Sequence, residues 1–151
     1  MLPVTPPDGA IPAGHPLRRM KDVAAQKMAP IRPLLVTMAA TWTVAPPLDQ
    51  GLLAMLLMAL YGIQSESELC DEIRRNQPFR WFLGLTPDGP RIEALPLAQM
   101  RSRLLRNSAA REFLDQTIEA ARAAGLLADP QFAPDAQQIT AWASPGASVT
   151  P

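Results

Sequence analysis

Residues 48–85, LDQGLLAMLLMALYGIQSESELCDEIRRNQPFRWFLGL, decide the fold of this chain. Within them, residues 52–63 are almost wholly apolar and rich in Leu, Met and Ala, which are strong helix formers. A helix that is apolar on every side has to be buried on every side. The run is too short to cross a bilayer, which takes roughly 18 residues or more. We therefore predict that it forms the central helix of a small globular core.

A second helix should follow directly, because Ser65 and Glu68 fit the capping-box pattern. In that pattern the serine oxygen accepts from the backbone N–H of Glu68, and the glutamate reaches back to the N–H of Ser65. The predicted helix covers residues 66–75, and Asn76 and Pro78 end it. Two helices joined by a short turn form a helix-turn-helix-like pair, although plain helical bundles share this feature.

Periodic apolar patterns predict further helices at residues 17–28, 96–105 and 109–124, with a short one within 34–40. The aromatic segment 79–82 should pack beneath the helix pair, and base stacking on exposed rings is the alternative. We therefore predict an all-α fold. It is a small bundle of five or six helices that contains the helix-turn-helix-like pair, with a Pro-rich N-terminal arm and a short irregular C-terminal tail.

The composition fits one cytoplasmic domain. Of 151 residues, 48% are apolar, which is enough for a core, and the first residues do not resemble a signal peptide. The single cysteine, Cys70, excludes an internal disulfide and a cysteine-based zinc site, and it falls on a helix face that we expect to be buried. His15 is the only histidine, and no cysteine or carboxylate cluster lies near it in the sequence. We therefore expect no metal site, no cofactor and no membrane partner.

Charge is distributed unevenly, although the net charge is zero. Residues 74–111 hold eight arginines and two carboxylates, a net charge of +6, whereas residues 1–73 carry −2 and residues 112–151 carry −4. The planar guanidinium group suits bidentate contact with phosphate better than the ammonium group of lysine does. The basic segment is thus a modest indication of nucleic-acid binding, and a solvated helix face explains it about equally well.

Four segments, in order along the chain, resemble one protein family. They are IPAGHPLRR at residues 11–19, ALYGIQSESELCDEIRRNQPFRWFLGL at 59–85, the helix at 109–127, and QFAPDAQQITAWAS at 131–144. Each is similar to a segment of the N-terminal region of InsH-like insertion-sequence transposases, a group of the bacterial DDE transposases. The stretch EALPLAQMR, residues 93–101, departs from the polar DHSTFSKNR that members usually carry there.

The resemblance implies a domain organisation and a partner. Residues 16–128 would be the helical N-terminal domain, and residues 129–151 a remnant of the start of the catalytic domain followed by a tail. The proline and glycine content of residues 1–15 predicts a disordered Pro-rich arm, and the small polar residues of the tail predict that it is disordered as well. The implied partner is double-stranded DNA at the terminal inverted repeats of the element, and the implied location is the bacterial nucleoid within the cytoplasm.

The resemblance makes Asp135 a vestigial first carboxylate of a catalytic site, and we expect no catalytic residue in this chain. In the family, the segment around it is the first strand of a ribonuclease H-like domain, and its aspartate is the first of three carboxylates that hold two Mg²⁺ ions. Pro134 and Ala136 depart from the family pattern, and 16 residues follow Asp135 in this chain. We therefore expect a fragment that does not cut DNA alone, with Mg²⁺ needed only by a complete family member. In the alternative interpretation, Asp135 and Gln138 cap a short helix.

The first functional hypothesis is a DNA-associated module of a transposase. Its phosphate contacts, mainly sequence-independent, would come from arginines of the basic segment, namely Arg74, Arg75, Arg80, Arg101, Arg103 and Arg106. The second hypothesis is a protein-interaction module that dimerises, or that assembles with an intact transposase and inhibits it. The third is an enzyme completed by a neighbouring reading frame, and the fourth is a remnant without function.

Overall fold

The computed structural model describes residues 11–41, 47–86 and 91–143. All regular structure in these ranges is helical, which confirms the predicted all-α fold, and none of these helices is long and apolar enough to cross a bilayer. Eight α-helices are present in the described ranges, more than the five or six expected. They are α1 (Pro16–Met28), α2 (Arg32–Thr41), α3 (Leu48–Tyr61), α4 (Glu66–Arg75), α5 (Gln77–Leu83), α6 (Ala94–Leu104), α7 (Ser108–Ala123) and α8 (Ala136–Ala143), with 3₁₀ turns at Ala29–Ile31 and Leu126–Ala128.

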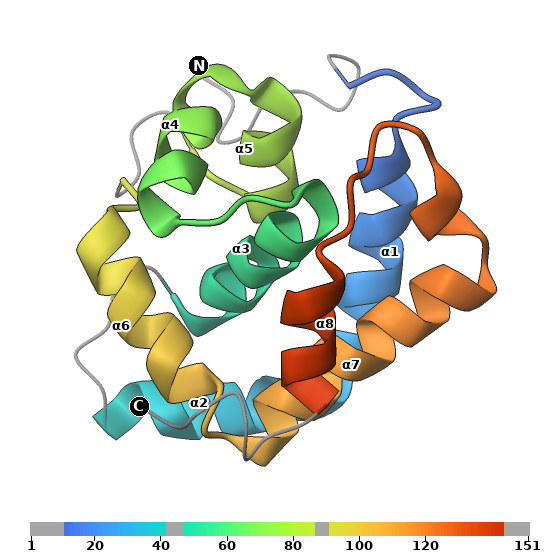
Figure 1. The fold of residues 1–151 in the computed structure, drawn as a ribbon. Coiled ribbons are helices and arrows are strands. Elements are labelled where there is room, and N and C mark those ends of the chain that lie inside the picture. Colours follow the sequence, from blue (N-terminus) through green and yellow to red (C-terminus); the bar gives the residue numbers. More distant parts are fainter. Residues whose placement is uncertain (1–10, 42–46, 87–90, 144–151) are drawn as a thin grey trace.

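Helix α3 is the centre of the bundle, as its apolar sequence predicted. Ten of its 14 residues are buried, and it contacts α2, α5, α6, α7 and α8. Figure 1 shows α4 and α5 beside one end of α3, α6 along one edge of the molecule, and α1, α7 and α8 on the opposite side. Five other helices therefore pack around α3 and bury most of its residues.

The turn between α3 and α4 has the predicted cap. Gly62 ends α3 with a φ of 65°, a left-handed conformation that favours glycine. Ser65 Oγ accepts from the backbone N–H of Glu68 at 3.1 Å, and α4 begins at Glu66 and ends at Arg75 as predicted. The reciprocal bond differs by one residue from the expected one, because the Glu68 carboxylate accepts from the N–H of Gln64 at 3.3 Å.

Helix α5 was not predicted, because Asn76 and Pro78 were interpreted only as the end of α4. Both also start a new helix: Asn76 Oδ1 accepts from the N–H of Phe79 at 3.0 Å, and proline is favourable in a first helical turn. The expected packing of the aromatic segment is confirmed, since Trp81 is 7% exposed and Phe82 is fully buried. Rings buried to this extent do not present their faces for base stacking.

Residues 11–15, the end of the expected Pro-rich arm, contact the bundle. Ile11 is 2% exposed, and the Arg18 guanidinium donates to the carbonyls of Ile11 at 2.8 Å and Pro12 at 3.2 Å. His15 caps α1, because its Nδ1 accepts from the N–H of Leu17 at 3.1 Å. Burial lowers the pKa of His15, which keeps the ring neutral for this role. Residues 1–10 of the arm and 144–151 of the tail lie outside the described residues.

Candidate nucleic-acid interface

Arg80 and Arg101, both singled out in the sequence, have structural partners in other elements. Arg80 donates from Nη1 to the carbonyls of Ile73 and Arg74, each at 2.9 Å. These carbonyls belong to the last turn of α4, where a positive charge complements the partial negative charge of the helix end. Arg80 therefore fastens α5 to the end of α4, a role that the sequence alone did not indicate.

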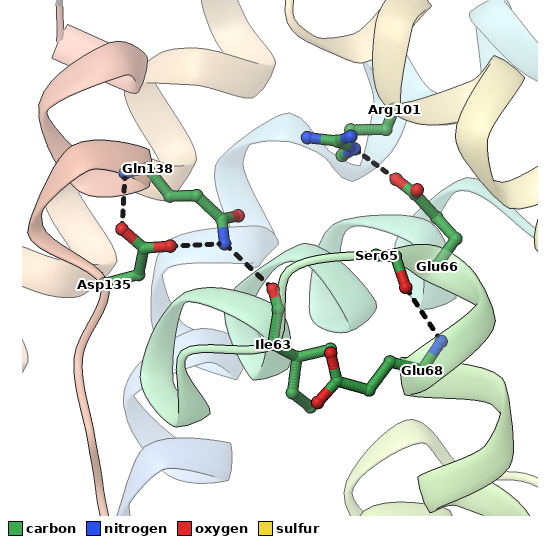
Figure 2. Close-up of polar contacts among 7 residues, drawn as sticks. All are labelled: Ile63, Ser65, Glu66, Glu68, Arg101, Asp135 and Gln138. Atoms are coloured by element: carbon green, nitrogen blue, oxygen red, sulfur yellow. Dashed lines mark hydrogen bonds and ion pairs between the residues drawn. The ribbon is translucent and has the colours of Figure 1, made fainter.

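Arg101 forms an ion pair between two helices. Its Nε donates to the carboxylate of Glu66, which joins α6 to the first turn of α4 (Figure 2). The Glu66 side chain is only 11% exposed and that of Arg101 is 34% exposed. A carboxylate removed from water to this extent needs a charged partner. Arg101 is consequently engaged in holding α4 against α6.

Arg74 and Arg75 are more accessible. Their side chains are 60% and 69% exposed, and each pairs with a carboxylate three residues earlier, Asp71 at 2.5 Å and Glu72 at 3.5 Å. Ion pairs between exposed side chains within one helix contribute less than about 1 kcal/mol. These two guanidinium groups can therefore exchange their carboxylates for a phosphate at little cost.

Arg103 and Arg106 lie at the other end of the α4–α6 pair. Both are exposed, Arg103 in the last turn of α6 and Arg106 just after it. Helices α4 and α6 run in opposite directions, since Glu66 at the start of α4 meets Arg101 near the end of α6, while Arg74 near the end of α4 lies beside the start of α6. The exposed arginines therefore form two groups, one at each end of α6.

Arg91 belongs to the first of these groups and was not among the six candidates. It lies with Arg74 in a polar hollow that Ser67, Cys70 and Glu93 also line. Arg91 belongs to the basic segment at residues 74–111. Its position beside Arg74 could not be predicted, because nothing in the sequence showed that the start of α6 lies beside α4. Burial raises the pKa of the Cys70 thiol, so the cysteine in this hollow stays protonated at neutral pH.

Asp135 caps a helix, as the alternative interpretation predicted. Its Oδ1 accepts from the backbone N–H groups of Gln137 at 3.0 Å and Gln138 at 3.2 Å, and its Oδ2 accepts from the side-chain amides of Gln138 at 3.1 Å and Gln64 at 3.0 Å (Figure 2 shows the bonds with Gln138). The hydrogen bonds with Gln138, and then that with Gln64, hold the pKa of Asp135 below its ordinary value. The residue is thus the N-cap of α8.

The segment before α8 is not the strand that the resemblance implied. The N–H groups of Ala133 and Asp135 donate to the carbonyls of Leu60 at 2.8 Å and Ala59 at 2.7 Å, and the Gln138 side chain donates to the carbonyl of Ile63 at 3.2 Å. These acceptors lie in the last turn of α3 and just after it, where a helix leaves carbonyls without partners. The segment therefore bonds to the end of α3 in place of neighbouring strands.

Packing supports the same arrangement. Tyr61 at the end of α3 lies between Phe79 and Phe132, with ring centroids 4.8 Å and 5.3 Å away, and burial raises its pKa. Phe132 and Trp142 are 7% and 3% exposed. Among the residues that the structure describes, no three His, Cys, Asp or Glu side chains are grouped in a way that could hold a metal ion.

A comparison with known protein families identifies the family of this chain. Residues 6–103 match the family described as Transposase domain (DUF772), which is more than half of the sequence. The chain belongs to this transposase domain family. The matched range of the transposase domain includes α1 to α5, most of α6, and the arginines from Arg74 to Arg103; it ends before Arg106, α7 and Asp135. No curated protein and no solved structure matched the chain.

Proposed function

We propose that this transposase domain binds double-stranded DNA during transposition, at the terminal inverted repeats of an InsH-like element of the DDE type. The observation that carries the proposal is the position of the basic segment. It lies largely within the part of the chain that matches the transposase domain, and its exposed arginines gather at the two ends of α6. Such a protein would be associated with the nucleoid.

The arginines divide into two roles under this proposal. Arg74, Arg75, Arg103 and Arg106, with the addition of Arg91, contact phosphates, because their side chains are exposed to solvent. Arg80 and Arg101 position the helices that carry them, through the carbonyls at the end of α4 and through Glu66.

Under the same proposal, this chain does not cut DNA by itself. The Asp135 carboxylate accepts four hydrogen bonds from backbone and amide groups of the bundle. A carboxylate that holds a catalytic Mg²⁺ has its oxygens directed at the ion and shares it with further carboxylates. Supercoiled plasmid incubated with the chain and Mg²⁺ should remain intact, whereas magnesium-dependent nicking would overturn this part of the proposal.

DNA binding is tested by fluorescence anisotropy of a labelled duplex as a function of salt. Four or five phosphate contacts predict a slope of about −4 for the logarithm of the binding constant against the logarithm of the salt concentration. A duplex that carries the terminal repeat should bind more tightly than a scrambled duplex. Absence of binding at low salt would refute the proposal.

A second candidate function, protein association, is favoured by α2. Val36 is 72% exposed and Leu34 is 37% exposed, and a groove that includes Leu35, Ala39 and Leu48 lies between α2 and the start of α3. Through this face the chain would dimerise or assemble with an intact transposase. Light scattering tests the idea: a dimer that Val36→Glu converts to a monomer supports it, and a wild-type monomer that does not bind the intact enzyme refutes it.

A further inference from the structure

The exposed faces of the helices differ in their suitability for DNA. Helix α4 carries the exposed carboxylates of Glu68 and Asp71, α7 those of Glu112 and Glu119, and α1 that of Asp22. Each of these carboxylates would be repelled by the phosphates of a duplex. Helix α6 contains no carboxylate and bears exposed cationic and amide side chains. The second helix of the helix-turn-helix-like pair, α4, is therefore a poorer partner for DNA than α6.

The exposed side chains of α6 occupy one side of the helix. From one turn to the next they are separated by three or four residues, and only one pair is adjacent, so they fall within an arc of about 100°. Leu97, Met100 and Leu104 lie on the other side and are buried against the bundle. The exposed set consists of Leu95, Gln99, Ser102, Arg103 and, just past the helix, Arg106. Figure 1 shows α6 along one edge of the molecule, and the exposure of this set indicates that this side is turned away from the bundle.

Cations also flank α6 at both ends. Arg91 lies in the hollow beside the start of the helix, together with Arg74 and Glu93, and Arg106 follows its last turn. A helix of 11 residues is about 16 Å long, so the two cationic ends are separated by roughly the length of helix that a major groove accommodates. A helix of this length that crosses a major groove would bring each of its ends close to a different phosphate backbone.

We propose that α6 enters the major groove of duplex DNA and reads bases through Gln99 and Arg103. The inference rests on the DNA binding proposed above and deepens it from phosphate affinity to sequence recognition: Arg103 contacts a base instead of a phosphate, and the other exposed arginines keep their phosphate contacts. The Gln99 amide can pair with N6 and N7 of adenine, and the Arg103 guanidinium can pair with O6 and N7 of guanine. Leu95, which is 69% exposed, lies one turn before Gln99 and suits a thymine methyl group. Arg91 and Arg106 contact the flanking phosphates.

The test is selection from a pool of random duplexes, followed by sequencing. Wild-type chain should enrich a motif that contains adenine and guanine at fixed positions. Gln99→Ala should lose the adenine preference, and Arg103→Lys, which keeps the charge but not the planar fork, should lose the guanine preference. Each loss should be roughly ten-fold at one position. Binding to a fixed unrelated duplex should change by less than about two-fold, because the phosphate contacts remain.

Matched control variants come from α7. Gln116 and Arg122 are exposed residues of the same types on a helix that the proposal leaves out of the groove. Gln116→Ala and Arg122→Lys should therefore select the wild-type motif. Helical circular dichroism and thermal unfolding of all four variants should match the wild-type chain, since each change is at an exposed position.

The outcomes separate this inference from the proposed function. If the wild-type chain binds DNA but enriches no motif, or if Gln99→Ala and Arg103→Lys select the wild-type motif unchanged, α6 does not read bases and DNA binding still stands. If the wild-type chain binds no duplex at any salt concentration, the proposed function fails, and the reading of bases by α6 fails with it.

Discussion

Replacement of Asp135 distinguishes a helix cap from a catalytic carboxylate. Loss of an N-cap side chain costs about 1 kcal/mol, and Asp135→Ala also removes the acceptor of the Gln64 and Gln138 amides. We expect the free energy of unfolding to fall by about 2 kcal/mol in total. For a chain of this length, that corresponds to a decrease in melting temperature of roughly 4–8 °C. Asp135→Asn keeps one acceptor oxygen and should lose about half as much.

Urea unfolding followed by circular dichroism measures these differences. Asp22→Ala is the matched control, because Asp22 is an exposed aspartate on α1 and its loss should change stability by less than about 0.5 kcal/mol. Asp135→Ala with wild-type or higher stability would refute the cap. That result is the usual one for a residue retained for chemistry, since active-site groups commonly reduce stability.

The pH dependence of the same measurement has a definite sign. The pKa of Asp135 in the folded chain lies below its ordinary value of 3.8, so the folded state binds fewer protons than the unfolded state near that pH. The advantage of wild type over Asp135→Asn should be complete above pH 3.8 and should shrink as the pH falls through the folded pKa. An advantage that grows on acidification would contradict the assignment.

Three further predictions concern the contacts that shape the bundle. Gly62→Ala should lower the stability of the fold by more than Gly84→Ala does. Both glycines have φ near 70°, a conformation that costs alanine about 1–2 kcal/mol. Only at Gly62 would the new Cβ also lie 2.9 Å from the carbonyl oxygen of Ala133. Equal losses in urea unfolding would mean that residue 133 does not pack there. Arg101→Ala leaves the Glu66 carboxylate unpaired and should lower the free energy of unfolding by about 2 kcal/mol. In a double-mutant cycle, adding Glu66→Gln to this variant should restore part of the loss. Cys70 is 6% exposed, and burial raises the pKa of its thiol. At pH 7 it should therefore react with an aromatic disulfide reagent far more slowly in the folded chain than in urea. Equal rates in the two conditions would contradict its burial.

Local sequence signals predicted the elements that depend on local chemistry. The apolar run at 52–63 predicted the central helix, and Ser65 with Glu68 predicted the first residue of α4. Helix α5 was missed because Asn76 and Pro78 favour the end of one helix and the start of the next equally. A seven-residue helix offers too few turns for apolar periodicity to resolve that ambiguity.

Long-range partners were the part that the sequence did not reveal. Glu66 and Arg101 are 35 residues apart, and Gln138 bonds to the carbonyl of Ile63 across 75 residues. Nothing in the local pattern distinguishes Arg101, which is partly buried against Glu66, from the neighbouring Arg103, which is exposed on the other side of α6. The division of the arginines into phosphate contacts and structural contacts therefore required the fold.

The most direct test of the central claim compares salt dependence in two double variants of equal charge. Arg91→Gln with Arg106→Gln removes one cation from each end of α6, whereas Arg19→Gln with Arg122→Gln removes exposed cations on α1 and α7. The first variant should bind duplex DNA with a salt slope smaller in magnitude than that of wild type by about 1.8, since each phosphate contact contributes about 0.9. The second variant should keep the wild-type slope. Equal slopes for both variants would mean that Arg91 and Arg106 do not contact phosphates, which contradicts the proposed position of α6 on DNA.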